Sequence, residues 1–327
     1  MATDRTQAIR VHRFGGPEVL QWDEVGLPAP AADEVRIRQT AVGLNFIDVY
    51  HRSGLYPLEL PAGIGAEAAG MVELVGSEVE GLAVGDWVAY VGLPPGAYSE
   101  RRNWPAARLV KLPEGITDDL AAAVMLKGLT AWYLARRSYK VQPGDTVLLY
   151  AAAGGTGTLL AQWASTLGAR VIGVAGSEAK AQIARACGCA ETLLTNEPGF
   201  VKKVRDWSDG GVSVVYDSIG KDTFIQSLDC LRPHGTMVTF GNASGPVAPF
   251  SPMELAKRGS LHLTRPSVFD FIRTPADLAE GTGELFEHML RGAIRITIGQ
   301  RYPLRDAAAA HRALESRQTT GATLLDP

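Results

Sequence analysis

The sequence predicts an α/β protein of two domains, one β-rich and one built on a doubly wound parallel sheet. Residues 1–125 contain short alternating segments punctuated by glycine turns, a pattern typical of a compact antiparallel barrel. From about Asp118 helical periodicity begins, and strands then alternate with helices. After Thr264 this alternation weakens. We expect the tail to rejoin the first domain, with a cleft between the two lobes.

The individual elements follow from local periodicity. In the first domain, residues 35–38 and 87–90 alternate as strands do. Helical patterns cover residues 121–125 and 130–139. In the second domain, strands are expected at 146–150, 171–174, 213–217 and 236–240. In the tail, the pattern predicts a helix at about 275–291, a strand at 294–298, a helix at about 305–316 and a strand at 322–325.

The stretch from Val147 to Gly157 is the most informative part of the chain. A buried strand runs into Ala151-x-x-Gly154-x-x-Gly157, one glycine short of the G-x-G-x-x-G pattern, and a helix is expected from about Thr158 to Leu167. Glycines allow a tight turn and a close approach, and the amides at a helix start bind a diphosphate. The alternative is an ordinary crossover without a ligand, but the strand–glycine–helix–strand order favours a dinucleotide site.

The end of the second strand indicates which dinucleotide is bound. An NAD site usually has an acidic residue there, whereas this chain has Ala175-Gly176-Ser177. Ser177 offers a hydroxyl and Lys180 a cation, which suit the 2′-phosphate of NADPH. Glu178 would repel that phosphate, and Lys180 is alternatively a solvated surface lysine. The sequence favours NADPH.

Composition excludes several classes of function. The 327 residues carry a net charge of −3 and no basic run, so nucleic acid binding is not expected. No apolar segment is long enough to span a membrane, and the N-terminus lacks the apolar core of a signal peptide. The three cysteines, Cys187, Cys189 and Cys230, form no disulfide framework. We expect a cytoplasmic protein.

Several motifs give the chain a family resemblance over nearly its full length. It resembles the zinc-independent quinone oxidoreductases of the medium-chain dehydrogenase/reductase superfamily, the group that includes zeta-crystallin. The resemblance implies a GroES-like β-barrel catalytic domain at 1–125 and 266–327, a Rossmann NADPH-binding domain at 126–265, and a homodimer. The motifs are residues 15–20, 43–48, 52–57, 65–70, 127–131, 151–157, 216–220, 240–242, 264–267 and 314–317.

Metal ligands are missing where zinc-dependent relatives carry them. Asn45 and Ala66 stand at the positions of a Cys and a His ligand, and no cysteine precedes Cys187. Zinc needs three or four suitable ligands, so Glu67 alone does not suffice. The six histidines are scattered and contain no i, i+4 pair. No metal site is predicted.

The resemblance also implies which residues carry the chemistry. It places Asn45, Tyr50 and Tyr56 near the nicotinamide. Asn45 would donate an amide hydrogen bond to a carbonyl oxygen or to the cofactor amide, and the tyrosines would supply a stacking face or a phenol proton. Arg265 would polarise a quinone oxygen. For each of the four, a structural hydrogen-bonding role is the alternative.

The cofactor contacts are expected from both parts of the chain. Thr130 follows an expected helix start and would meet the nicotinamide-side phosphate or amide. Lys180 and Arg317 would reach the 2′-phosphate, and Thr195 stands where many relatives have a tyrosine. The remaining predicted contacts are Asn45, Gly154, Gly155, Thr156, Gly157, Gly176, Ser177, Ser218, Phe240, Asn242 and Ser244.

Three functions follow, in order of preference. The first is hydride transfer from NADPH to a quinone without a metal. The second is NADPH-dependent reduction of an enal or enone, which uses the same transfer to a conjugated carbon. The third is a structural or AU-rich RNA-binding role, as in relatives of zeta-crystallin, which the mild acidity of the chain disfavours. The homodimer is expected to pair sheet edges near residues 244–260.

Overall fold

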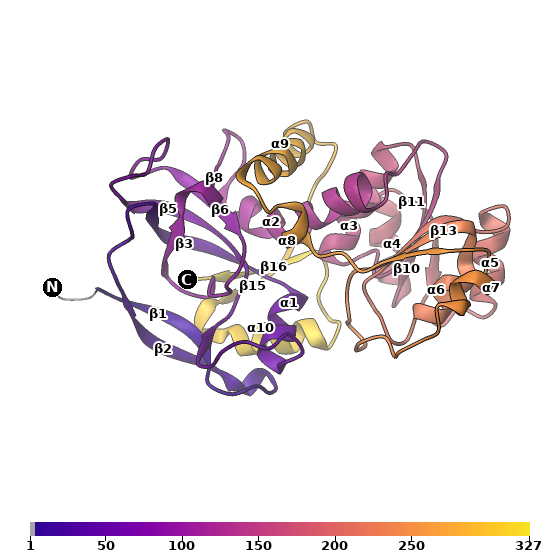
Figure 1. The fold of residues 1–327 in the computed structure, drawn as a ribbon, viewed down its shortest axis with the longest axis horizontal. Coiled ribbons are helices and arrows are strands. Elements are labelled where there is room, and N and C mark those ends of the chain that lie inside the picture. The colour runs from indigo at the N-terminus through magenta and orange to yellow at the C-terminus, as the bar shows by residue number, and fades with distance from the viewer. Residues whose placement is uncertain (1–3) are drawn as a thin grey trace. The chain divides into compact units, whose positions relative to one another are not determined.

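A computed structural model describes residues 4–327, and the chain divides into two compact units (Figure 1). Unit 1 comprises the chain up to Lys127 together with Ile272–Leu290 and Ile296–Pro327. Unit 2 comprises Gly128–Phe271 and Arg291–Arg295. The predicted α/β class is confirmed, and the tail does rejoin the β-rich part of the chain.

Unit 1 is built on two sheets. A three-stranded sheet has the order β2-β1-β4, and a seven-stranded sheet has the order β15-β16-β3-β5-β6-β8, with β7 paired to β3. All of these pairings are antiparallel except that of β15 with β16. The strands are β1 (Asp4–Val11), β2 (Leu20–Leu27), β3 (Glu34–Leu44), β4 (Ala62–Gly63), β5 (Glu67–Val75), β6 (Trp87–Val91), β7 (Arg101–Pro105), β8 (Val110–Lys111), β15 (Ile298–Pro303) and β16 (Ala322–Asp326).

The tail strand differs from the prediction. Residues 294–298 alternate in the sequence, yet β15 begins only at Ile298. Its partner β16 begins at Ala322, which lies opposite Ile298, so a strand forms only where a partner backbone is present. The predicted strand at 322–325 is confirmed, since β16 pairs with β3 through Thr323 and Leu44.

Two helical patterns of the sequence form one long helix. The expected segments at 121–125 and 130–139 are joined as α2 (Asp118–Tyr133), which a π-helical turn continues over Leu134–Ser138. The expectation of a new helix start near Thr130 is therefore wrong, because the run 121–135 is buried throughout except at Thr130 and shows little amphipathic contrast. The division between the units falls within α2, after Lys127. The helices wholly in unit 1 are α1 (Phe46–Ser53), α9 (Pro275–Leu290) and α10 (Ala307–Glu315), with short 3₁₀ turns at 17–19, 106–108 and 304–306.

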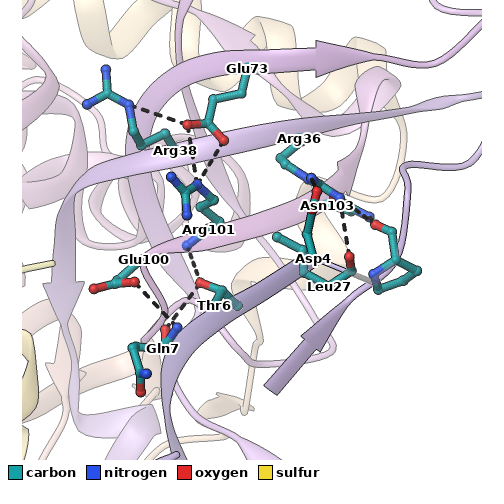
Figure 2. A network of polar contacts seen from close by, with 11 residues as sticks. Asp4, Thr6, Gln7, Leu27, Arg36, Arg38, Glu73, Glu100, Arg101 and Asn103 are labelled. Carbon is teal, nitrogen blue, oxygen red and sulfur yellow. Dashed lines mark hydrogen bonds and ion pairs between the residues drawn. The ribbon is translucent and has the colours of Figure 1, made fainter. Parts of the chain in front are cut away.

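The interior of unit 1 is apolar, while polar side chains tie its strands together at the surface. The core gathers buried residues of β1, β3, β5 and β6, among them Ile9, Ile37 and Tyr90. Outside it, Figure 2 shows Glu73 of β5 between two arginines, Arg38 of β3 and Arg101 of β7. These side chains are partly exposed, so each pair contributes little, and burial of the core residues dominates the stability.

Unit 2 contains a single parallel sheet of six strands in the order β11-β10-β9-β12-β13-β14. The direction of winding reverses at β9, which lies between β10 and β12. In such sheets ligands bind beyond the carboxyl ends of the strands at that reversal. The strands are β9 (Thr146–Leu149), β10 (Arg170–Ala175), β11 (Cys189–Leu194), β12 (Val212–Asp217), β13 (Leu231–Thr239) and β14 (His262–Thr264).

Helices follow the strands of unit 2 in alternation, as predicted. They are α3 (Gly155–Thr166), α4 (Glu178–Ala186), α5 (Phe200–Trp207), α6 (Phe224–Cys230), α7 (Met253–Lys257) and α8 (Val268–Phe271). The strands read as apolar runs because the sheet is buried, with Leu148, Ile172 and Val215 wholly inaccessible. Among the helices of residues 4–327, none is long and apolar enough to cross a membrane.

Candidate functional site

The glycine loop of unit 2 exposes the start of a helix. The strand β9 ends at Leu149, and α3 begins at Gly155 with Gly154 as its N-cap in an extended conformation. The helix therefore starts three residues before the predicted Thr158. Gly157 lies in its first turn, where a Cβ atom would come within 2.2 Å of the carbonyl oxygen of Ala151. The loop thus brings the first amides of a 12-residue helix to the carboxyl edge of the sheet, where an anion would meet them.

The end of β10 carries the residues predicted to choose the cofactor. Gly176 has open space where a Cβ would lie, which leaves room beside the strand end. Ser177 caps α4 by accepting a hydrogen bond from the Lys180 backbone (3.4 Å). Glu178, which would oppose a phosphate, forms an ion pair with Arg185. The charge of Glu178 is therefore partly offset by a neighbouring cation.

The next strand ends are held together by hydrogen bonds within unit 2. The backbone and hydroxyl of Thr195 both donate to the carbonyl of Ala175, at 3.0 and 3.3 Å. Ser244 donates to the carbonyl of Ile219 at 2.9 Å, and its hydroxyl accepts from the Asp222 backbone at 3.1 Å. Both predicted contact residues thus have structural hydrogen bonds at the edge where a ligand would bind.

Asp217 organises this edge and was not among the predicted site residues. It is fully buried at the end of β12, next to Ser218. Its carboxylate accepts hydrogen bonds from the backbone of Ile219 (2.7 Å) and Gly220 and from the hydroxyl of Thr223 (2.7 Å). Burial raises the pKa of Asp217, and these hydrogen bonds oppose that rise. Asp217 therefore fixes the backbone of the loop that follows β12.

Arg265 also belongs to the edge of the unit 2 sheet. It follows β14, is exposed, and donates to the carbonyl of Thr239 at 3.0 Å. With the amide of Asn242 oriented to satisfy its neighbours, that amide oxygen accepts from Arg265 at 3.2 Å. The structure therefore brings Arg265 together with the predicted loop of Phe240 and Asn242.

Two further predicted cofactor contacts lie outside these loops. Thr130 is half-buried and lies within α2, so it does not stand at a helix start. Arg317 follows α10 in unit 1 with a φ of +60° and already takes part in polar contacts.

Unit 1 contributes a buried polar cluster around Asn45, the N-cap of α1. One amide hydrogen of Asn45 is directed to Glu67 (Nδ2 to Oε1, 2.7 Å) and the other to the Gly43 carbonyl (3.3 Å). Its backbone N–H donates to Asp48 at 2.8 Å, closing a capping box. Both amide hydrogens of Asn45 thus have partners within the protein, and the oxygen Oδ1 is the side-chain group with capacity to meet a ligand. The predicted donation from Asn45 to a ligand stays a prediction.

Glu67 is the centre of this cluster. It is wholly buried in β5, and Lys127, with 7% of its side chain exposed, donates to the same Oε1 atom at 2.8 Å. The other oxygen accepts from the backbone of Leu126 at 2.5 Å. At Gly43 a Cβ would lie 2.2 Å from Oε1, so only glycine leaves room for the carboxylate. Glu67 therefore has a compensating charge and hydrogen bonds, as a buried carboxylate requires.

A directed chain of hydrogen bonds continues from Asp48. The Tyr98 hydroxyl donates to Asp48 at 2.9 Å and lies 3.2 Å from His311 Nε2. Arg52 donates to His311 Nδ1 at 3.0 Å and binds both carboxylate oxygens of Glu315. Since arginine only donates, His311 is neutral with its proton on Nε2. Burial, with a smaller effect of Arg52, lowers the pKa of His311 to about 3, and burial raises that of Asp48 to about 7.

The two predicted tyrosines lie side by side in unit 1. Tyr50 is buried on α1, and its ring meets that of the half-buried Tyr56 edge-on, with centroids 5.2 Å apart. The backbone of Tyr56 also donates to the Tyr50 carbonyl at 3.1 Å. The structure thus brings together Asn45, Tyr50 and Tyr56 on and around one short helix.

Acidic, histidine and cysteine side chains do not gather into a metal site in the part of the chain that the structure describes. Within residues 4–327, no group of three or more such side chains has the arrangement that could hold a metal ion. At the positions compared with zinc ligands, Asn45 is hydrogen bonded to Glu67 and Ala66 has no donor atom.

Comparison with known proteins decides the family. A relative from Pseudomonas aeruginosa named quinone oxidoreductase is 49% identical, and the alignment covers 98% of this chain and 99% of that one. The chain belongs to the quinone oxidoreductases of the medium-chain dehydrogenase/reductase superfamily. Family models described as "Alcohol dehydrogenase GroES-like domain" and "Zinc-binding dehydrogenase" match residues 31–114 and 155–282.

Solved structures of this family agree closely with the fold. The quinone oxidoreductase of Escherichia coli, crystallised with NADPH, has a TM-score of 0.96 at 45% identity and covers 98% of this chain and 100% of that one. A 2-haloacrylate reductase from Burkholderia is also 45% identical, over 97% of this chain and 98% of that one. The family therefore includes at least two kinds of named reductase.

The charged partners of Asn45 were missed by reasoning from sequence. The sequence presents Glu67 only as an insufficient metal ligand and Lys127 only as part of a motif. The one available signal was a charged residue within an apolar run: Glu67 stands among alanines and glycines, and Lys127 lies in the apolar stretch before Gly128. Such residues need partners when buried, but the sequence does not say which partners they find.

Proposed function

We propose that this protein is an NADPH-dependent quinone reductase that transfers a hydride to its acceptor without a metal. The observation that carries the proposal is full-length similarity, at 45–49% identity, to proteins named quinone oxidoreductase, one of them crystallised with NADPH. The glycine loop of unit 2 supports it, since Gly157 permits the tight turn and Gly176 leaves open space at the strand end.

Residues of unit 2 would hold the dinucleotide. The first amides of α3 would bind the diphosphate, and NADPH when bound supplies the hydride. Ser177 and Lys180, together with Arg317, would bind the 2′-phosphate. The other proposed contacts are Asn45, Thr130, Gly154, Gly155, Thr156, Gly157, Gly176, Thr195, Ser218, Phe240, Asn242 and Ser244.

The substrate side of the site would be formed by aromatic and polar groups. Tyr50 and Tyr56 offer ring faces and hydroxyls to a flat acceptor, and Arg265 offers a cation toward its oxygen. A quinone is already electron-poor, so positioning and charge stabilisation suffice to reduce it. We propose catalytic roles for these three residues and for Asn45.

A second candidate is reduction of a conjugated carbonyl compound. The relative named 2-haloacrylate reductase, at 45% identity, specifically favours it. Steady-state assays with NADPH would compare a naphthoquinone with a 2-alkenal and 2-chloroacrylate. We expect a higher kcat/KM for the naphthoquinone, and faster turnover of the alkenal or the acrylate would replace the first proposal by the second.

The choice of NADPH over NADH depends on Lys180. Replacing Lys180 by alanine removes a cation from the proposed phosphate site, and we expect the ratio of kcat/KM values for NADPH and NADH to fall by about tenfold. Lys202, an exposed lysine of α5 paired with Asp206, is the matched control. An unchanged ratio in the Lys180 variant would overturn this assignment.

The proposal includes the organisation and setting of the protein. Residues 1–125 and 266–327 would form the catalytic domain and residues 126–265 the NADPH-binding domain. The relatives named quinone oxidoreductase support a small-molecule substrate, and we also propose a cytoplasmic location. A homodimer through the region of residues 244–260 would give twice the chain mass in light scattering, and a monomer mass would refute it.

A further inference from the structure

The amide of Asn45 is fixed in one orientation by charged groups that do not themselves reach the surface. Its Nδ2 atom donates both hydrogens inside the cluster, to Glu67 and to the carbonyl of Gly43. Asn45 is 6% exposed and Glu67 is wholly buried. An amide that turned over would direct its oxygen at the Glu67 carboxylate, and two acceptors facing each other in the interior are unfavourable.

Lys127 supplies the counter-charge of the Glu67 carboxylate that orients the Asn45 amide. Its ammonium group and the Asn45 amide share the oxygen Oε1, at 2.8 and 2.7 Å. The second oxygen accepts from the backbone N–H of Leu126, and the missing side chain of Gly43 leaves the space that the carboxylate occupies. The two carboxylate oxygens are therefore held by three donors, and a carboxylate accepts hydrogen bonds only.

We propose that Glu67 and Lys127 are positioning residues that present Asn45 to the cofactor as a hydrogen-bond acceptor, for the carboxamide N–H of the nicotinamide. This inference rests on the proposed function, since it assumes that Asn45 faces the nicotinamide ring. An amide oxygen has two lone pairs, so Oδ1 can accept from a ligand while it helps to cap α1. Asn45 then orients the cofactor, and the charge that develops on the substrate oxygen is stabilised by other groups.

Cofactor analogues separate this role from mere structural support. The 3-acetylpyridine analogue of NADP⁺ lacks the carboxamide N–H donors, whereas the thionicotinamide analogue keeps them. Calorimetric titration should show that the protein binds NADP⁺ and the thionicotinamide analogue about tenfold more tightly than the acetylpyridine analogue, which is the loss of one hydrogen bond.

The decisive measurement is that ratio in the variants. In Glu67→Gln, Lys127→Met and Asn45→Ala we expect this affinity ratio to fall toward one. The fall should come from weaker binding of NADP⁺ and the thionicotinamide analogue, with binding of the acetylpyridine analogue unchanged. Combining Glu67→Gln with Asn45→Ala should change the ratio no further. Lys127→Arg, which keeps the cation, should restore part of it. If Glu67 and Lys127 had only a structural role, their replacement would weaken the binding of all three dinucleotides equally. If Glu67→Gln fails to fold, the Lys127 variants carry the same test.

The outcomes distinguish the two proposals. If none of the dinucleotides binds the unaltered protein, the proposed function is wrong. If NADP⁺ binds but the unaltered protein does not discriminate against the acetylpyridine analogue, Asn45 is not the acceptor for the carboxamide. If discrimination persists in the Glu67 and Lys127 variants but is lost in Asn45→Ala, these two residues do not position it.

Discussion

The glycine loop of unit 2 and the Asn45 cluster of unit 1 are built in opposite ways. The loop consists of backbone from one short segment, in which Gly154 and Gly157 keep space clear at the start of α3. The cluster consists of side chains far apart in the sequence: Glu67 lies 22 residues from Asn45, and Lys127 a further 60 residues along the chain. The loop depends on backbone and on the absence of side chains, whereas the cluster depends on paired side-chain charges and on the space that Gly43 leaves for them.

This difference determines how each region fails. The loop fails by steric overlap, because a single added methyl group meets backbone that cannot retreat. The cluster fails by electrostatics, because removal of one charge leaves its partner buried and uncompensated. Four substitutions test this contrast.

The largest effect is expected from removal of the buried cation. In Lys127→Met the Glu67 carboxylate loses its counter-charge, and we expect the free energy of unfolding to fall by about 3–5 kcal/mol. Urea unfolding measures this change. The double variant Glu67→Gln/Lys127→Met should recover most of the loss, since no charge then remains unpaired. Lys203→Met, which breaks a partly exposed pair with Glu197, should cost less than about 1 kcal/mol. Equal losses at Lys127 and Lys203 would contradict the contrast.

Steric overlap in the loop comes next. Gly157→Ala places a Cβ 2.2 Å from the carbonyl oxygen of Ala151, so the first turn of α3 must shift. We expect the Kd for NADPH to rise about 100-fold, measured by fluorescence titration, since the amides that bind the diphosphate move with it. Gly283→Ala in α9 meets no atom within 4 Å and is the control, with unchanged affinity. Normal binding by Gly157→Ala would show that the loop is not the diphosphate site.

The same contrast explains what the sequence could predict. The order of strands and helices in unit 2 and the glycine loop were predictable because they are local patterns, of strand, turn and helix. The position of β15 was not, because Ile298 pairs with a strand that begins at Ala322. Nor was the orientation of the Asn45 amide, since only the fold brings Glu67 and Lys127 to it.

A pH dependence tests the acidic side of the cluster. Burial raises the pKa of Asp48 from 3.8 to about 7, and its Oδ1 atom has no hydrogen-bond partner among the described residues. Because the pKa of Asp48 is higher in the folded than in the unfolded state, protonated Asp48 contributes its full stabilisation below about pH 4. This contribution to the free energy of unfolding is lost as the pH rises to about 7. Asp48→Asn is neutral throughout, so its stability relative to the unaltered protein should increase over that interval. The pKa shift of Asp48 corresponds to at most about 4 kcal/mol in the free energy of unfolding. Because the structure can relax around the charge, we expect a change on the order of 2 kcal/mol.

Urea unfolding of both proteins at about pH 5 and about pH 8 measures this difference. The neutral His311 is present in both proteins, so its own titration cancels. A difference in stability that does not change between the two pH values would show that Asp48 is already ionised at the lower one.

The smallest effect concerns a surface charge beside the loop. Glu178 opposes a 2′-phosphate, but its pairing with Arg185 and its exposure reduce that repulsion. We expect Glu178→Gln to bind NADPH about two- to threefold more tightly at low salt, with NADH unaffected. Glu191→Gln is the matched control, because Glu191 forms a similarly exposed pair with Arg170 near the opposite end of the strands. If Glu178→Gln strengthened binding of both coenzymes alike, the carboxylate would act on the diphosphate that they share and not on the 2′-phosphate. The amides of α3 and the charge on α4 would then act on the same group of the cofactor.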